Sequence, residues 1–201
     1  MRATRRVTLA AIAAFAVAPP FARAATTPED DALVAKAVAY LDALSSVKGP
    51  FQQTDPHGGV ANGEFYLARP GRARFQYQPP SGLLITSDGK TVIMSDSKRK
   101  TFQRFPLRST PLALFLADRI HLDRGVRVTR VDRSANGFSL TAEGAHGVKQ
   151  GQITLYFNEE PIRLIGWAVT DPQGRSTRVS LGPLTPMGTP GAELFTQTPS
   201  G

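Results

Sequence analysis

Apolar residues recur at helical spacing in one stretch near the start of the chain. Leucine, valine and alanine side chains three or four positions apart fall on one face of a helix: Leu33, Val34, Ala37, Val38, Leu41 and Leu44. Thr27 suits the N-cap of this helix, and Pro28 suits its first position. We therefore predict an amphipathic helix that begins at Pro28 and ends before Gly49-Pro50, with its apolar stripe packed on another element.

From Phe51 onward the apolar and polar residues tend to alternate, which is typical of strands with one buried face. The connections are short and rich in Gly, Pro, Asp and Ser, so we expect hairpins. The predicted strands are residues 51–54, 61–68, 72–77, 83–87, 91–95, 101–105, 126–132, 138–142, 152–157, 162–170 and 177–181. These elements predict a mainly β protein with one strongly curved antiparallel sheet, either closed as a barrel or half closed and plugged by helices.

Two apolar segments do not fit a strand with one buried face. Residues 112–120 follow Thr110-Pro111 and place leucines and Phe115 over more than one face of a second helix. Such a helix is buried or covers something apolar. Residues 162–169 carry apolar side chains on both faces of a strand, which implies that something packs against each face.

The first 24 residues have the features of an export signal. Three arginines lie among the first six residues, an apolar run follows at residues 7–18, and Ala22-Arg23-Ala24 is a suitable cleavage site. The apolar run is too short to span a bilayer. We predict a signal peptide that is cleaved after Ala24, by the Sec or the twin-arginine route, and a single exported domain over residues 25–201.

Charge and cysteine content narrow the function further. The chain carries a net charge of +8, but four of its arginines lie in the leader, which leaves 20 basic and 16 acidic side chains, a charge of +4. This modest surplus on an exported domain favours solubility and gives no reason to expect a nucleic-acid partner. The absence of cysteine excludes disulfides, thiolate metal sites and a lipidated cysteine. We expect a soluble monomer.

The residue types that carry catalysis are not arranged as an active site. The histidines (His57, His121 and His146) are far apart in sequence and lack metal-ligand spacing, and Glu159-Glu160 precedes Pro161 in a turn. There is no Gly-x-Ser-x-Gly elbow and no glycine-rich phosphate loop. We therefore predict no enzyme activity, no cofactor and no metal, while a triad assembled across strands stays open as an alternative.

Each group of basic residues allows more than one structural interpretation. Residues 98–100 suit a solvated loop, and the four arginines spaced every third residue from Arg124 to Arg133 suit either a solvated strand or a weak membrane or partner surface. Arg69 ends an apolar strand directly before Pro70-Gly71, so it is either an exposed turn residue or a buried arginine. If buried, its five donors need partners such as the carbonyl groups at a helix end.

Several short motifs resemble one family over nearly the whole exported part of the chain. They are Phe51-Gln52-Gln53, Gly63-Glu64-Phe65, Arg69-Pro70-Gly71, Phe75-Gln76-Tyr77-Gln78-Pro79, Ile85-Thr86-Ser87-Asp88-Gly89-Lys90 and Phe195-Thr196. In order and spacing they resemble the LolA-type periplasmic carriers of outer-membrane lipoproteins. The resemblance implies an unclosed barrel of eleven strands, covered by short helices, with an apolar cavity for acyl chains. It also implies a periplasmic chaperone that takes acylated lipoproteins from an inner-membrane ABC transporter to an outer-membrane acceptor.

The resemblance further implies which residues do the work. Arg69 falls where the family has the arginine that holds the helical lid closed through backbone carbonyl groups. The candidates for the acyl-chain cavity are Phe65, Leu67, Phe75, Tyr77, Leu84, Leu112, Leu114, Phe115, Leu116, Ile165 and Trp167.

Other functions remain compatible with the same fold. A carrier of another lipid, such as a glycolipid or a polyprenyl product, is one alternative, and a sensor that binds stray lipoproteins is another. The missing lipidation cysteine argues against a membrane-anchored acceptor.

Overall fold

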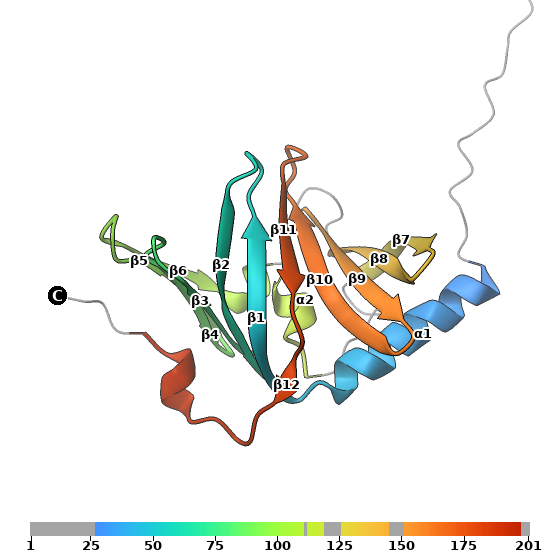
Figure 1. Ribbon diagram of the computed structural model, residues 1–201, viewed down its shortest axis with the longest axis horizontal. Coiled ribbons are helices and arrows are strands. Elements are labelled where there is room, and N and C mark those ends of the chain that lie inside the picture. Colours follow the sequence, from blue (N-terminus) through green and yellow to red (C-terminus); the bar gives the residue numbers. More distant parts are fainter. Residues whose placement is uncertain (1–26, 111, 119–125, 145–150, 198–201) are drawn as a thin grey trace, which may run out of the picture.

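A computed structural model describes residues 27–110, 112–118, 126–144 and 151–197 (Figure 1). One antiparallel sheet of 12 strands dominates it, in the order β6-β5-β4-β3-β2-β1-β11-β10-β9-β8-β7, with β12 paired to β1. The predicted mainly β fold with an unclosed, curved sheet is confirmed, since β6 and β7 form the two ends of this order and do not pair with each other.

The two halves of the sheet meet at the pairing of β1 with β11. The strands of the first half are β1 (Ser46–Thr54), β2 (Val60–Ala68), β3 (Arg72–Tyr77), β4 (Leu83–Asp88), β5 (Thr91–Asp96) and β6 (Thr101–Pro106). Those of the second half are β7 (Val126–Ser134), β8 (Gly137–Gly144), β9 (Gln152–Glu159), β10 (Ile162–Thr170), β11 (Ser176–Leu181) and β12 (Thr185–Pro186). The helical elements are α1 (Pro28–Ala43), α2 (Leu112–Phe115) and the 3₁₀ turns η1 (Leu107–Ser109) and η3 (Ala192–Phe195).

Helix α1 begins where the sequence predicts. The Thr27 side chain accepts a hydrogen bond from the Asp30 N–H, while the Asp30 carboxylate accepts from the Thr27 N–H, which forms a capping box. Its apolar stripe, with Leu33, Ala37 and Leu41, packs into the core. Figure 1 shows α1 along the β7–β10 half of the sheet, and ring contact between Tyr40 and Phe157 joins it to β9.

The first strand is longer than predicted. Strand β1 begins at Ser46 and passes through Gly49-Pro50, where the sequence indicates a break. Gly49 is needed there because the backbone of Pro183 approaches closely, and a Cβ at this position would lie 2.6 Å from the Pro183 oxygen. Tertiary packing therefore overrides the local preference of glycine and proline for turns.

One face of the sheet carries the core, and we call it the inner face. On β2 and β3 the alternate residues Phe65, Leu67, Ala73, Phe75 and Tyr77 are buried on this face. They join one continuous apolar cluster with buried residues of β8–β11, α1 and α2. The opposite face of β3 and β4 is covered by η3 near the C-terminus.

Two elements of the structure differ from the prediction, the second helix and strand β10. The helix expected at residues 112–120 is only one turn, Leu112–Phe115, followed by a bend, while residues 119 and 120 lie outside the described part. Strand β10 contains a bulge between Leu164 and Gly166, which changes the faces to which its apolar residues point.

Among the described residues, no helix has the length and apolar character needed to span a membrane.

Candidate functional site

Four aromatic side chains meet at the centre of the inner face. Phe65 from β2, Phe75 from β3, Phe115 from α2 and Trp167 from β10 are all buried. Ring centroids lie 4.9 Å apart for Phe65–Phe75, 5.8 Å for Phe65–Trp167 and 5.5 Å for Phe115–Trp167. These separations are those of favourable aromatic pairs. The helical turn α2 is thus packed, through Phe115, against a floor made by strands from both halves of the sheet.

A second group of rings extends this floor along the strands, toward the turn that joins β1 to β2. Phe51 contacts Phe75 and Tyr77, with centroids 5.6 Å and 5.0 Å apart. The Tyr77 hydroxyl donates a hydrogen bond of 2.6 Å to Gln53 Oε1. Burial raises the pKa of Tyr77 to about 12. Tyr77 and Gln53 therefore add polar groups to the inner face at this end.

Arg69 lies directly beneath α2. Its side chain is 5% exposed, although the residue follows the end of β2. Its Nη2 donates a hydrogen bond of 2.8 Å to the Phe115 carbonyl oxygen, and its guanidinium carbon lies 5.5 Å from the centroid of the Phe115 ring. Arg69 therefore holds both the backbone and the ring of the last residue of α2.

The charge of Arg69 is only partly compensated. Nη1 lies 3.8 Å from Asp42 Oδ1, an ion pair beyond hydrogen-bond reach, and neither Nε nor Nη1 has a hydrogen-bond partner within the described part of the chain. Burial lowers the pKa of Arg69, and the charges of Asp42 and Asp118 oppose this effect. Arginine stays protonated in proteins, so the incomplete hydrogen bonding weakens the closed arrangement rather than neutralising the group.

The turn after Arg69 gives α2 a second contact. The Gly71 N–H donates a hydrogen bond of 2.8 Å to the Leu116 carbonyl oxygen. The Gly71 carbonyl in turn accepts a hydrogen bond of 2.6 Å from the buried Ser87 hydroxyl. The Arg69-Pro70-Gly71 motif thus supplies two donors to consecutive carbonyl groups at the end of α2.

The structure gathers most of the predicted cavity residues on the inner face. Seven of them are buried in the core cluster: Phe65, Leu67, Phe75, Tyr77, Phe115, Leu116 and Trp167. Leu112 is half-buried and packs against this cluster. Their side chains fill the centre of the inner face in this arrangement. The side chain of Leu114 lies outside the described part.

Two predicted residues lie elsewhere. Ile165 is 39% exposed, because it is the extra residue of the bulge in β10. Leu84 shares its strand face with Thr86, whose hydroxyl accepts a hydrogen bond from Gln197 on the outer side. Its neighbours Leu83 and Ile85 contact the core cluster instead. Neither Ile165 nor Leu84 therefore belongs to the cluster around Phe115.

Sequence reasoning missed two participants in this site. Phe51 packs on Phe75 and Tyr77, and its place in the alternating pattern of β1 could have identified it. Asp42 is an ordinary exposed-face residue of α1 by sequence, and only the fold brings it to Arg69.

The groups considered for other chemistry have structural roles or remain outside the described residues. No cluster of three potential metal ligands occurs in the described part of the chain. The His57 N–H donates to Asp55 in the β1–β2 turn, and Glu159 pairs with Lys36 of α1, whereas His121 and His146 are not described.

The arginines of β7 are paired with acids and do not form a bare cationic surface. Arg127 pairs with Glu143, and Arg130 pairs with Asp132. Arg133 contacts Glu29 and Asp30, two of the three acids in the first turn of α1, each at 2.9 Å. Arg124 lies outside the described residues.

Comparison with known proteins agrees with this arrangement. The chain matches the family described as outer membrane lipoprotein carrier protein LolA over residues 42–198. An outer-membrane lipoprotein carrier protein of Chromobacterium violaceum is 31% identical over 137 residues, which cover 65% of this chain and 62% of that protein. The chain therefore spans about three fifths of the length of this relative.

Solved structures resemble this fold at low sequence identity. An uncharacterized conserved protein from Thermus thermophilus has a TM-score of 0.50 at 12% identity, with 82% of this chain and 94% of that chain covered. A LolA superfamily protein from Nitrosomonas europaea has a TM-score of 0.46 at 12% identity, with 81% and 97% covered.

The family match includes every strand of the sheet, the Arg69-Pro70-Gly71 turn and the one-turn helix above it. The chain belongs to the LolA family of outer membrane lipoprotein carrier proteins.

Proposed function

We propose that this protein is a periplasmic chaperone that binds the acyl chains of lipoproteins and carries them from the inner to the outer membrane. One observation carries the proposal: α2 covers a buried aromatic floor and is held there by hydrogen bonds from Gly71 and from Arg69, whose Nε and Nη1 have no hydrogen-bond partner among the described residues. An apolar floor under a weakly held cover suits a ligand that must be both bound and released.

Energetics explain why the cover should be weakly held. Each buried methylene group is worth about 0.8 kcal/mol, so two or three long acyl chains represent on the order of 20–35 kcal/mol against water. Non-covalent affinity saturates near roughly 20 kcal/mol, and a carrier near that limit would never release its cargo. A conformational change that opposes binding lowers the net affinity and permits transfer.

In the closed state, contacts within the protein itself oppose the binding of acyl chains. Acyl chains that reach Phe65 and Trp167 must displace Phe115 and Leu116, which are buried there. Displacement breaks the hydrogen bonds from Arg69 and Gly71 to α2. When the ligand is released, α2 closes again and restores these contacts, which favours release.

Arg69→Leu tests this role directly. The variant replaces the hydrogen-bond donor to the Phe115 carbonyl by an apolar side chain, so the closed state becomes less stable. We expect the variant to accept lipoproteins from inner-membrane vesicles and to retain them when outer-membrane vesicles are added. Arg72→Leu is the control, because Arg72 lies on the outer side against Phe195. Normal delivery by Arg69→Leu would contradict the proposed role of Arg69.

The proposal includes the route as well as the ligand. The partners would be an inner-membrane ABC transporter as donor and an outer-membrane acceptor, and the chain would reach the periplasm after cleavage behind Ala24 as a single domain of residues 25–201. N-terminal sequencing of the protein from the periplasm tests the cleavage.

The ligand can be identified without assuming its nature. Mass spectrometry of protein purified from the periplasm without detergent should find acylated lipoproteins bound one to one. A glycolipid or polyprenyl lipid in their place would keep the binding site and change the cargo.

A further inference from the structure

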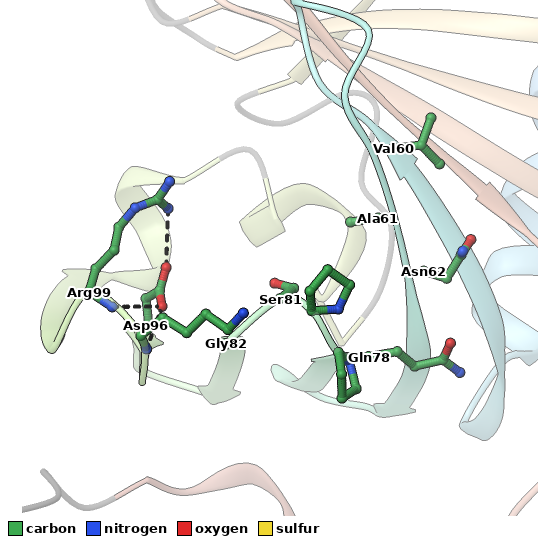
Figure 2. Close-up of a pocket in the computed structure, with 11 residues that line it drawn as sticks. Val60, Ala61, Asn62, Gln78, Ser81, Gly82, Asp96 and Arg99 are labelled. Atoms are coloured by element: carbon green, nitrogen blue, oxygen red, sulfur yellow. Dashed lines mark hydrogen bonds and ion pairs between the residues drawn. The ribbon is translucent and has the colours of Figure 1, made fainter.

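A separate pocket of about 400 Å³ opens at the end of the sheet away from Arg69 (Figure 2). It lies between the start of β2, the corner that joins β3 to β4, and the turn that joins β5 to β6. Figure 2 shows Val60 and Asn62 of β2 on one side of it and Asp96 and Arg99 on the other. We call it the rim pocket.

The rim pocket borders the inner face of the sheet. Ala61 lines the pocket and also packs against the core cluster. Ala61, Phe65 and Leu67 share one face of β2, because side chains of a strand alternate. On the other side of the pocket, Asp96 is the register partner of Leu83, which also contacts the core cluster.

The distance along β2 matches an acyl chain. Six residues separate Ala61 from Leu67, which corresponds to roughly 20 Å at the rise of a β-strand. One leaflet of a bilayer has a hydrocarbon thickness of about 15 Å, half of the whole core. An acyl chain whose end reaches the aromatic floor near α2 would therefore place its polar head at the rim pocket.

The lining of the rim pocket is partly apolar, with Val60, Ala61, Pro79 and Pro80, and partly polar, with one cation that lacks an ion pair among the described residues, Lys98. The Asp96 carboxylate accepts hydrogen bonds from the backbone N–H groups of Lys98 and Arg99, at 2.9 Å and 3.1 Å, and from Arg99 Nη1 at 3.1 Å. Asp96 is thereby occupied in shaping the turn. Asn62 Oδ1 accepts a hydrogen bond from Gln52 Nε2 at 3.1 Å, so the amide NH₂ of Asn62 and the amide of Gln78 are the neutral hydrogen-bonding groups of the pocket.

We propose that the rim pocket binds the polar peptide that directly follows the acylated residue of the cargo, with a preference for acidic side chains. This inference rests on the proposed function, since it takes the acyl chains to lie on the aromatic floor. Lys98 then supplies the attraction for a carboxylate, and the neutral amides bind peptide groups of any sequence. The pocket would give the carrier a preference among cargoes that their shared acyl chains cannot provide.

Two fluorescent lipopeptides test the proposal. They carry the same acylated cysteine and differ only in the next four residues, which are Asp and Glu in one and Ser in the other. We expect the full-length exported protein to bind the acidic lipopeptide about 2- to 5-fold more tightly at low salt, the range of a solvent-exposed ion pair. The preference should decline as salt screens the charge.

Charge-reversal variants assign the preference to the pocket. Lys98→Glu should abolish or reverse the preference for the acidic lipopeptide over the Ser lipopeptide. Lys90→Glu is the matched control, because it changes the net charge equally but lies in the β4–β5 turn at the opposite end of the sheet. It should keep the preference.

The outcomes separate this inference from the proposed function. Tight binding of both lipopeptides without a preference, or a preference that Lys98→Glu leaves intact, would overturn the rim-pocket assignment alone. Failure of both lipopeptides to bind would overturn the carrier function and the inference with it. Tighter binding of an anionic phospholipid than of either lipopeptide would assign the pocket to a lipid headgroup and contradict the peptide as its occupant.

Discussion

At the scale of single residues, Arg69 is buried although its guanidinium group is incompletely hydrogen-bonded. Its guanidinium has one good hydrogen bond, to the Phe115 carbonyl, and an ion pair at 3.8 Å with Asp42. A fully satisfied arginine would hold α2 more firmly, and an exposed arginine would not hold it at all. The local sequence leaves a buried and an exposed arginine equally open, the resemblance to the family favours the buried one, and in the structure the side chain is buried.

Tyr77 gives a residue-scale prediction on pH. Burial raises the pKa of Tyr77 to about 12, whereas an unfolded tyrosine titrates near ~10. The fold thus stabilises the neutral phenol, and this contribution is fully present below about pH 10 and is lost as the pH rises toward about 12. Tyr77→Phe should therefore show a smaller loss of unfolding free energy over this window than the unmodified protein, measured by urea unfolding.

The same variant should also be less stable at neutral pH, by about 1 kcal/mol, because Gln53 loses the hydroxyl that donates to it. Tyr66→Phe on the opposite strand face is the control. Equal pH dependence in all three proteins would contradict the role assigned to Tyr77.

Gly71 provides a second residue-scale prediction. It has φ +74°, and a Cβ at this position would lie 2.5 Å from Gly89 Cα, so alanine would suffer both backbone strain and overlap. We expect Gly71→Ala to lower the unfolding free energy by at least about 2 kcal/mol. Gly58→Ala is a matched control, since Gly58 has φ +85° with open space around it and should cost only about 1 kcal/mol. If denaturant unfolding showed equal losses of unfolding free energy for the two variants, this would contradict the close packing of the Gly71 turn on the Gly89 turn.

At the scale of elements, β10 depends on its bulge. Leu164 pairs with Phe157 and Trp167 pairs with Leu155, so both point to the inner face although three positions separate them. A regular strand would place them on opposite faces. The extra residue, Ile165, is turned outward as a consequence.

This arrangement predicts different effects for adjacent isoleucine and leucine. Leu164→Ala should cost about 2–5 kcal/mol of unfolding free energy, as expected for a buried leucine. Ile165→Ala should cost about 1 kcal/mol or less, and Ile165→Asp should leave lipopeptide affinity unchanged. Urea unfolding and fluorescence titration measure the two quantities. A large loss of lipopeptide affinity in Ile165→Asp would return Ile165 to the acyl-chain site.

At the scale of the whole molecule, the proposed carrier function requires an interior that can change its contents, and an unclosed sheet with α2 on its inner face suits this requirement. The aromatic floor is built from the consecutive strands β2 and β3 and from β10, which is distant in sequence, and α2 contacts it through the Phe115 ring. In the proposed mechanism, movement of α2 exposes the floor while the sheet keeps its pairing. The rim pocket lies at the other end of β2, outside the contacts that hold α2.

Trp167 is the single tryptophan of the chain and reports on this change. Its ring centroid lies 5.5 Å from that of Phe115 in the closed state. Binding of an acylated peptide should replace Phe115 by hydrocarbon and produce a saturable change in Trp167 fluorescence. The same peptide without acyl chains is the control and should cause no change. An acylated peptide that binds without altering the fluorescence would show that its chains lie away from the aromatic floor.

Much of the fold follows from local sequence signals. The capping residues and the apolar stripe locate α1, and the turn residues locate most strands to within two positions of their ends. Strand β1 and the helix after Thr110 are the exceptions. Gly49 lies in a strand because Pro183 approaches it, and α2 ends after one turn with its carbonyl groups bonded to the Arg69–Gly71 turn. Both depend on contacts with segments distant in the chain.

The sequence by itself therefore determined most of the secondary elements, the antiparallel sheet and the choice of Arg69 as a candidate residue, since these rest on spacing, turn chemistry and recognisable motifs. Tertiary structure alone decided which apolar residues face Phe115, because a single bulge in β10 reverses the alternation that sequence reasoning relies on. It also decided that Asp42 lies near Arg69 and that Ala61 and Lys98 line one pocket. Such neighbours come from separate elements, and their distances depend on sheet curvature, which no local pattern encodes.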